Sequence, residues 1–338
     1  MMSALNSERG KFVFVLGCFT ALALVPAVSG SFGVDLVTKI MIYALFALSL
    51  ELLVGSTGLV CFGQAAFFGI GAYATVLLSP ADGAASLWWL MPVCIVLAAA
   101  YALAVGALSL RTRGVYFIMV TLAFAQMAYY VVHDTPLGGG TDGIYLNAKP
   151  TLWPGPALDN ALALYYFTLL CLAGAFVKLA LLLRSRFGRA LAGIKANEQR
   201  MRAAGFSTYP YKLAAFTISG GIAGAAGCLF AVKDGFVNPE LLSWHFSGAV
   251  LIMIILGGLG HLRGALIGAF AFALLQEFFK SEDIFGAFAK HWHLGLGLSI
   301  IASVALLPQG LVGLPAQWRE RQARRASRAG AAAHEVAP

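Results

Sequence analysis

Long runs of uncharged, apolar residues recur along the chain and leave few folds open to it. A helix needs about 20 apolar residues to cross the roughly 30 Å hydrocarbon core of a bilayer. Runs of this length occur at residues 12–34, 88–110, 114–132, 213–232 and 294–318. The composition agrees, because 11% of the residues are charged, against about 25% in soluble proteins. The sequence therefore predicts an all-α, polytopic integral membrane helix bundle.

Other apolar stretches divide less clearly into spans. Residues 52–81 are uncharged but rich in glycine, which predicts a loop or broken helix followed by a span. Residues 40–50 lie between Lys39 and Glu51 and are predicted to belong to a separate helix. One more long span and two short spans are expected at residues 160–183, 246–260 and 264–276. The total is about ten transmembrane helices.

The basic residues between the spans predict the orientation of the chain, because cytoplasmic loops carry an excess of Lys and Arg. If the spans alternate, every basic cluster falls on one side: Arg9 with Lys11, Arg111 with Arg113, the loop after residue 184, and Arg263. Both termini are then cytoplasmic. The chain divides into a single transmembrane domain at 1–318 and a basic tail at 319–338, which can meet anionic membrane lipid. The net charge of +8 follows from this topology, and nucleic-acid binding is not expected, because no basic stripe is interleaved with stacking aromatic residues.

The loop at 184–212 concentrates charge between two apolar spans. Against one acidic residue, Glu198, it carries seven basic residues: Arg184, Arg186, Arg189, Lys195, Arg200, Arg202 and Lys212. The positive-inside bias places this loop in the cytoplasm. A long, helix-prone cytoplasmic loop of this kind indicates docking to a partner.

Polar residues inside the spans are candidates for lining a pathway through the membrane, because an unpaired polar group in hydrocarbon is costly. They are Glu51, Gln64, Thr121, Gln126 and Gln276. A carboxylate at a helix end is the alternative role for Glu51, and hydrogen bonding between helices is the alternative for Gln64, Thr121 and Gln126. Phe67 joins the pathway candidates, although packing is the more ordinary role of an aromatic residue. The glycine-rich segment around it, 63–73, suits either an aliphatic ligand or close helix packing.

Glycines spaced four apart predict close contacts between helices. Gly220 and Gly224 form one such pair, and Gly260, Gly264 and Gly268 form a longer series. Each set places small residues on one helix face, where another backbone can approach.

The sequence carries no signature of a cofactor site. Its five cysteines lie in apolar segments, with neither a CxxC pair nor a histidine at ligand spacing, so no metal site is predicted. The phosphate-binding pattern GxxxxGK[ST] is absent. This chain is therefore not expected to bind ATP.

The chain resembles one family nearly end to end, and the resemblance rests on five segments in order. They are GLVCFGQAAFFGIGAYATVLL at 58–78, LRTRGVYFIMVTLAFAQM at 110–127, GGGTDGI at 138–144, the stretch from SRFGRALAGIKANEQ to AAGCLFA at 185–231, and ILGGLGHLRGALIGA at 255–269. In these segments the chain resembles the LivM-type permease subunit of ATP-binding-cassette (ABC) importers for branched-chain amino acids. The resemblance implies the ABC importer permease fold.

For the loop at 184–212, the resemblance implies a coupling segment similar to the EAA loop that sits in a groove of the ATPase subunit. Gly188, Arg189, Asn197, Glu198 and Gly205 are the residues assigned to this contact. A short amphipathic helix held between two spans can also transmit rigid-body motion on physical grounds. The sequence departs from the family at Arg200 and Met201, where alanines are more common, so the contact surface here is expected to be bulkier and more basic.

The resemblance also implies partners: a second, LivH-like permease, two ABC ATPase subunits that bind ATP and Mg²⁺, and a periplasmic substrate-binding protein. The chain itself would be a non-catalytic transport subunit in the bacterial inner membrane. The expected substrates are leucine, isoleucine and valine, or related small amino acids and amides.

Two other classes of function stay open. An ion-gradient-driven secondary transporter or channel would use Glu51 as its proton or sodium site, although such carriers usually bury several ionisable groups near the bilayer midplane. An enzyme would use His133 with Asp134, or the histidines of the stretch 291–293, but neither set has a nucleophile or a convincing third partner.

Overall fold

The computed structural model describes residues 17–80, 83, 85–151, 160–281, 290–307 and 310–314. Arg9, Lys11 and the tail at 319–338 lie outside the described residues. Within the described part, seven helices are long and apolar enough to cross a membrane: α2 (Ser31–Thr57), α4 (Leu87–Ser109), α5 (Val115–Asp134), α6 (Ala161–Arg184), α9 (Thr208–Asp234), α11 (Leu262–Lys280) and the helix that begins with α13 (Trp292–Leu306). Three shorter apolar helices are Gly17–Val28, α3 (Gln64–Leu77) and α10 (Trp244–Gly257). These ten apolar helices agree with the predicted number.

Helices α2 and α9 form the centre of the bundle, where they are buried by the helices around them. Helix α9 contacts α2, α3 and α4 closely because one of its faces consists of small residues. A methyl group added at Gly220 or Gly224 would meet α4, and one added at Gly227 would collide with the carbonyl oxygen of Phe68 in α3. The prediction of a close contact at Gly220 and Gly224 is confirmed.

Helices α10 and α11 form a tight hairpin. A side chain at Gly268 would collide with the α10 backbone at Met253 and Gly257, and one at Gly264 would collide with the carbonyl oxygen of Gly258, just after α10. The prediction that Gly260 continues this helical face was wrong, because α11 begins at Leu262 and Gly260 lies in the preceding turn with φ +86°. A residue with a side chain rarely adopts this left-handed backbone.

The first spans divide differently from the prediction. Residues 40–50 do not belong to a separate helix but lie inside the 27-residue helix α2. The run at 12–34 also contains a break, because a helix ends at Val28 and α2 starts at Ser31. Gly58 ends α2 in the left-handed region with φ +73°. The loop that follows, residues 58–63, leads into α3, which confirms the predicted loop before a helix, although α3 has only 14 residues.

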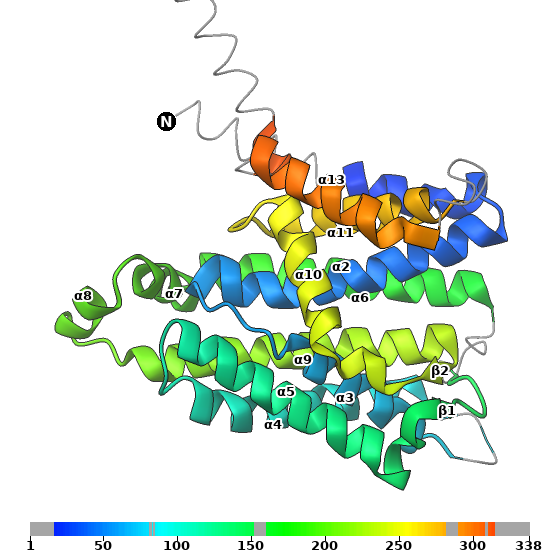
Figure 1. Ribbon diagram of the computed structural model, residues 1–338, viewed down its shortest axis with the longest axis horizontal. Coiled ribbons are helices and arrows are strands. Elements are labelled where there is room, and N and C mark those ends of the chain that lie inside the picture. Colours follow the sequence, from blue (N-terminus) through cyan, green and yellow to red (C-terminus); the bar gives the residue numbers. More distant parts are fainter. Residues whose placement is uncertain are drawn as a thin grey trace, which may run out of the picture.

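The long helices lie side by side, with different structures at their two ends (Figure 1). At one end, α7 (Arg186–Ala196) and α8 (Glu198–Ala203) project beyond the spans. At the other end, strand β1 (Ile144–Tyr145) pairs antiparallel with β2 (Phe236–Val237). The described 3-10 turns are η1 (Pro136–Gly138), η2 (Gly140–Asp142), η3 (Pro239–Leu242) and η5 (Leu311–Gly313).

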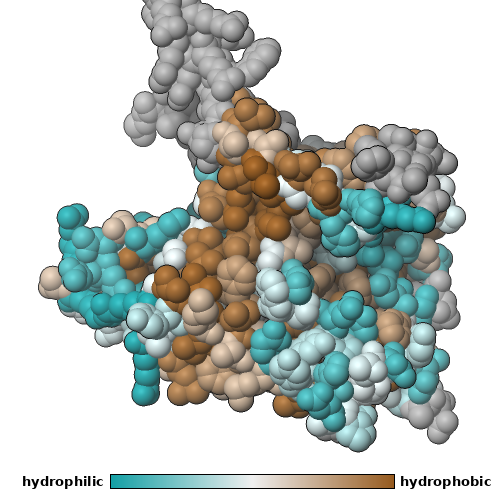
Figure 2. Space-filling model, viewed as in Figure 1, coloured by the Kyte–Doolittle hydropathy of each residue, from teal (hydrophilic) through white to brown (hydrophobic). Residues whose placement is uncertain are grey.

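The surface divides along the same direction. A hydrophobic zone covers the middle of the molecule, and hydrophilic residues gather over α7 and α8 at one end and over the opposite end (Figure 2). This distribution fits helices that cross a bilayer with both ends in water. The protein is a multi-pass membrane protein.

Candidate functional site

The first candidate site is the segment formed by α7 and α8, here called the α7–α8 hairpin. Ser185 starts α7 as a cap, and its Oγ accepts a hydrogen bond from the Gly188 N–H at 3.4 Å. Helix α7 is amphipathic, since Leu191 and Ile194 are buried while Arg189 is exposed. Gly188 lies so close to the backbone of Leu183 that an added side chain would collide with it.

Asn197 and Gly205 define the two ends of α8. The Asn197 side chain accepts a hydrogen bond from the Arg200 N–H at 2.9 Å, which caps the helix. At the other end Gly205 has φ +85°, and the Phe206 N–H donates to the Met201 carbonyl at 3.0 Å. This is a Schellman termination, which favours glycine. The roles of Asn197 and Gly205 inside the hairpin are therefore structural, whatever partner the hairpin binds.

Glu198 ties α8 to the start of α9. Its carboxylate accepts hydrogen bonds from Lys212 Nζ at 2.6 Å, from an Arg202 guanidinium nitrogen at 2.6 Å and from Thr208 Oγ1 at 2.9 Å. Partial burial acts to raise the pKa of Glu198, but the hydrogen bonds from Lys212 and Thr208, the Lys212 charge and the Arg202 hydrogen bond lower the pKa to about 2. The carboxylate is thus ionised at neutral pH and occupied within the hairpin.

Two further hydrogen bonds attach the hairpin and its exit to other spans. Lys195 Nζ donates to the carbonyl oxygen of Gly55 in α2 at 2.7 Å. The Tyr209 hydroxyl donates to the carbonyl oxygen of Ala107 in α4 at 2.8 Å. Through Lys195, and through the cluster of Glu198 with Lys212 and Thr208, the hairpin is hydrogen-bonded to α2 and α9, and Tyr209 of α9 extends this connection to α4. A displacement of the hairpin therefore acts directly on α2 and α9, and on α4 through α9.

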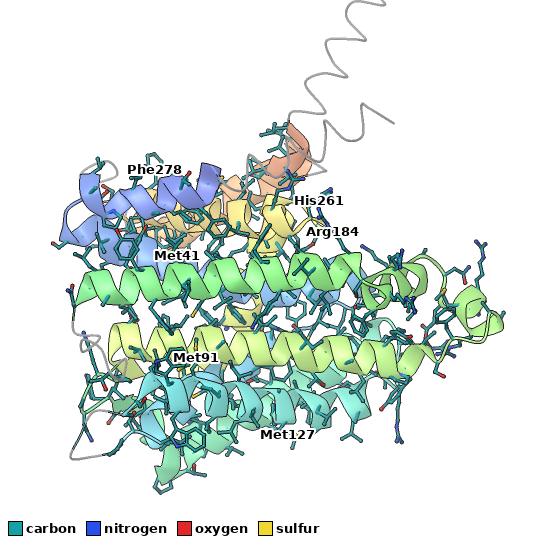
Figure 3. All side chains as sticks on the ribbon, turned by 180° about the vertical axis from the view of Figure 1, so that it is seen from behind. Met41, Met91, Met127, Arg184, His261 and Phe278 are labelled. Atoms are coloured by element: carbon teal, nitrogen blue, oxygen red, sulfur yellow. The ribbon has the colours of Figure 1, made fainter. Side chains whose placement is uncertain are left out.

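The outer face of the hairpin is basic and polar. Arg189, Gln199 and Arg200 are exposed, and α8 has no buried residue. Arg184 and His261 lie toward the same end of the molecule, whereas Phe278 lies toward the other end (Figure 3). An acidic or polar groove is the chemical complement of such a face.

The pathway candidates lie at separate places in the bundle. Glu51 is six residues inside the end of α2 and is 3% exposed, so it is not at the helix end. Thr121 lies on the buried face of α5 and donates to the Ile118 carbonyl at 2.9 Å. Phe67 is buried, with its ring centroid 5.5 Å from that of Phe216 and 6.0 Å from that of Tyr101.

Gln64 begins α3 in the interior of the bundle. Its amide nitrogen donates to Ser49 Oγ at 2.8 Å and to Ser219 Oγ at 2.9 Å, which joins α3 to α2 and α9. Its oxygen is buried without a hydrogen-bond partner among the described residues. The amide thus makes the hydrogen bonds between helices that were the alternative expectation for this residue.

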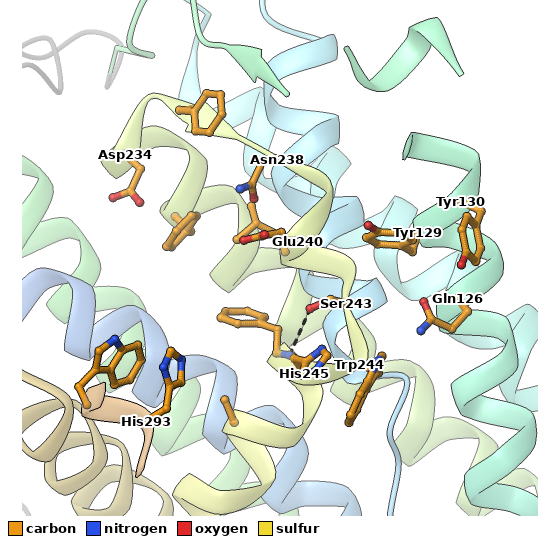
Figure 4. A pocket seen from close by; sticks show the side chains of 16 residues that line it. Gln126, Tyr129, Tyr130, Asp234, Asn238, Glu240, Ser243, Trp244, His245 and His293 are labelled. Atoms are coloured by element: carbon orange, nitrogen blue, oxygen red, sulfur yellow. Dashed lines mark hydrogen bonds between the residues drawn. The ribbon is translucent and has the colours of Figure 1, made fainter. Parts of the chain in front are cut away.

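A hollow of about 800 Å³ opens near the end of the molecule opposite the hairpin, and Gln126 lines it. Its walls come from α5, the end of α9, the η3–α10 segment and the start of α13 (Figure 4). Aromatic side chains alternate with polar ones: Tyr129, Tyr130, Trp244 and Trp292 with Asn238, Glu240, His245 and His293. These residues come from four segments with no common motif, so the sequence alone does not bring them together.

The histidines considered for an enzyme show no catalytic arrangement. His133 Nδ1 lies 2.6 Å from Asp134 Oδ1 at the end of α5, and both side chains are partly exposed. His293 follows Trp292, whose ring it overlaps at 3.6 Å between centroids. The described residues include no group of three or more His, Cys, Asp or Glu that could hold a metal ion.

Comparison with protein families gives a match over residues 33–302 to the model described as "Branched-chain amino acid transport system / permease component". The chain belongs to this family. The match spans the bundle from α2 to α13, including the α7–α8 hairpin and the hollow.

Individual relatives agree with the family assignment. The chain is 32% identical to the high-affinity branched-chain amino acid transport system permease protein LivM of Escherichia coli K12, over 87% of this chain and 74% of that protein. The LivM of Salmonella typhimurium matches to the same extent. A shorter match, 30% identical over 35% of this chain and 30% of that protein, is to the xylose transport system permease protein XylH of Escherichia coli K12. No solved structure matches the chain. The resemblance to a LivM-type permease is thus confirmed, and these relatives are transport permease subunits.

Proposed function

We propose that this chain is the transmembrane subunit of an ATP-driven importer in the bacterial inner membrane, and that its α7–α8 hairpin docks into the ATPase subunits. The observation that carries the proposal is the hairpin itself, which projects from the spans, presents a basic face and is hydrogen-bonded to α2 and α9. A second permease and a periplasmic binding protein complete the assembly. ATP and Mg²⁺ belong to the ATPases, and this chain is not an enzyme.

Branched-chain amino acids are the proposed substrates, with other small amino acids or amides as the wider class. The family description and the names of both LivM relatives support this choice. The hollow at the opposite end is the proposed entrance, since its aromatic walls suit an aliphatic side chain and its polar groups suit the charged ends of an amino acid. Gln126 is the pathway candidate that lines it.

In the proposed cycle, the loaded binding protein docks at the end that carries the hollow. ATP-driven closure of the ATPases then moves the hairpin, and the packed helices attached to it move with it as rigid units. The substrate passes between the two permeases. In states of the cycle in which the helices separate, the proposal keeps four further pathway candidates: Glu51, Gln64, Phe67 and Thr121.

Purification of the tagged chain from its native membrane tests this proposal. We expect mass spectrometry to find two kinds of partner, a second permease and ATPase subunits, and we expect ligand-loaded binding protein to stimulate ATP hydrolysis. Replacing Arg189 and Arg200 together by glutamate should remove the ATPases from the complex, because both residues are exposed and lie outside the Glu198 cluster. Lys290→Glu, which reverses an exposed charge ahead of α13, is the matched control.

The gradient-driven carrier predicts a different result. Uptake of labelled leucine would then stop when the ion gradients are dissipated while ATP is maintained, and the purified chain would carry no ATPase. Under our proposal, uptake continues in these conditions and stops when ATP is depleted. A chain that purifies without ATPases and loses uptake with the gradient refutes the proposal.

A further inference from the structure

Glu51 is a buried carboxylate that the proposed docking of ATPases leaves unexplained. It lies in α2 and is 3% exposed. Its Oε1 accepts a hydrogen bond from the Gly260 N–H at 2.7 Å, and Oε2 has no partner among the described residues. A carboxylate inside a membrane-spanning segment is costly and usually functional. Because Gly260 lies in the turn between α10 and α11, this hydrogen bond joins Glu51 to that turn.

Gly55, also in α2, contacts the α7–α8 hairpin close to Glu51. Its carbonyl oxygen accepts the hydrogen bond from Lys195 Nζ of α7 at 2.7 Å. Its Cα faces the Glu51 side chain so closely that an added methyl group would collide with the carboxylate. Glu51 and Gly55 are four residues apart and therefore neighbours on one helix face. One turn of α2 thus contacts α7 through Gly55 and the α10–α11 turn through Glu51.

The α10–α11 turn can transmit a displacement because it is closely packed. A side chain at Gly257 would collide with the backbone of Gly264 in α11, and one at Gly264 would collide with the carbonyl oxygen of Gly258 in the turn. Gly310, after α13, lies against Gly258 of the same turn. Close-packed elements of this kind shift as units rather than deforming continuously. A force on the turn therefore reaches α10, which also forms part of the hollow's wall.

We infer that Glu51 is a positioning residue of the transport cycle, which ties the α10–α11 turn to the α2–α7 contact so that movement of the α7–α8 hairpin reaches α10. This inference rests on the proposed function. It assigns Glu51 a mechanical role, in place of a proton site or a group that contacts substrate. The role depends on the side-chain oxygen that accepts the hydrogen bond from the Gly260 N–H. The amide oxygen of a glutamine can therefore replace the carboxylate oxygen.

Three substitutions separate this role from simple stability. Glu51→Gln keeps the shape and an acceptor oxygen. Glu51→Leu removes the acceptor. Gly55→Ala keeps Glu51, but its methyl group would collide with Oε1, the oxygen that accepts the Gly260 N–H, and so displace it. The matched control is Glu277→Leu, which removes an exposed carboxylate near the far end of α11.

The experiment measures ATP hydrolysed per leucine transported by the purified complex in liposomes with loaded binding protein. In Glu51→Leu and Gly55→Ala we expect this ratio to rise about ten-fold, through lost uptake at near-normal hydrolysis, since substitutions within a coupled network can change coupling to this extent. Glu51→Gln and Glu277→Leu should stay within about two-fold of the wild type. Hydrogen exchange of the peptide that contains residues 258–261 should be faster in the first two variants and unchanged in the others.

The outcomes distinguish the inference from the proposed function. A wild-type chain without ATPases overturns the proposed function and this inference with it. A wild-type complex that couples, together with normal coupling in Glu51→Leu, overturns the inference alone. If Glu51→Leu fails to assemble, Gly55→Ala decides: an unchanged ratio there contradicts the inference, and an increased ratio supports it. A loss of coupling in Glu51→Gln equal to that in Glu51→Leu also contradicts it, because the charge would then matter rather than the acceptor.

Discussion

Replacing Glu198 by alanine should loosen the α7–α8 hairpin without disturbing the spans. The carboxylate is 23% exposed and its partner Lys212 is 14% exposed, so this pair is largely shielded from water. A shielded, charge-assisted hydrogen bond contributes at least about 1.5 kcal/mol, and an exposed pair such as that with Arg202 contributes about 0.2–1 kcal/mol. We therefore expect a loss of about 2 kcal/mol in the local stability of the hairpin, which is about a 30-fold change in its opening equilibrium.

Hydrogen exchange of the detergent-purified chain measures this effect directly. The peptide that covers α8 and Gly205 should exchange about 30-fold faster in Glu198→Ala, while peptides from α9 beyond the cluster stay protected. Gln199→Ala is the matched control, because it truncates the exposed neighbour on the same helix. Equal exchange in the two variants, or no change in Glu198→Ala, would refute the argument that Glu198 organises the hairpin.

The same cluster predicts a pH dependence. The pKa of Glu198 is lowered from 4.5 to about 2. A group whose pKa is lowered in the folded state stabilises that state above its ordinary pKa, and the stabilisation is lost as the pH falls toward the lowered value. Protection of the α8 peptide, corrected for intrinsic exchange, should be constant from neutral pH down to about 5 and should decrease below about 4.5. A decrease near pH 6 would contradict this assignment.

Three further changes test the glycine and polar contacts. Gly205→Ala should speed exchange in the α8 peptide, because a left-handed residue with a side chain costs about 1–2 kcal/mol. Gly227→Ala should lower the thermal stability of the purified chain, since overpacking costs about 1–3 kcal/mol, whereas Gly248→Ala, which meets nothing within 4 Å, should leave it unchanged. Gln64→Leu should cost about 1–3 kcal/mol of stability, because its two serine partners lose a buried hydrogen bond; an unchanged melting temperature would contradict the importance of this network.

The sequence predicted a basic, helix-prone segment between two spans, because the signals for such a segment are local. A run of basic residues between two apolar spans, with Asn197 before a short helix and Gly205 after it, fixes a cap, a helix and a termination within about ten residues. The number of apolar helices followed from span length in the same way. The boundaries of α2 did not follow, because Lys39 and Glu51 lie inside this helix and do not limit a span.

Two of the charged residues inside the continuous α2 each contact a specific partner. Lys39 is half-buried with its ammonium 6.0 Å from the centroid of the Tyr43 ring, and Glu51 receives the Gly260 N–H. Each charged residue thus has a partner that makes its place in the helix tolerable. The Tyr43 ring is local, but the Gly260 contact comes from another segment and leaves no mark in the sequence around Glu51. The hollow could not be predicted from the sequence either, because its walls come from separate segments that meet only in the fold.

The most direct test of ATPase docking is a photo-reactive amino acid placed at single positions of the chain in native membranes. At Gln199, which is exposed on α8, we predict a cross-link to an ATPase subunit. At Tyr145, which is 71% exposed at the opposite end of the bundle, we predict none. A cross-link to the ATPase from Tyr145, or an ATPase that co-purifies but never cross-links to Gln199, would contradict the proposal that the α7–α8 hairpin is the coupling site.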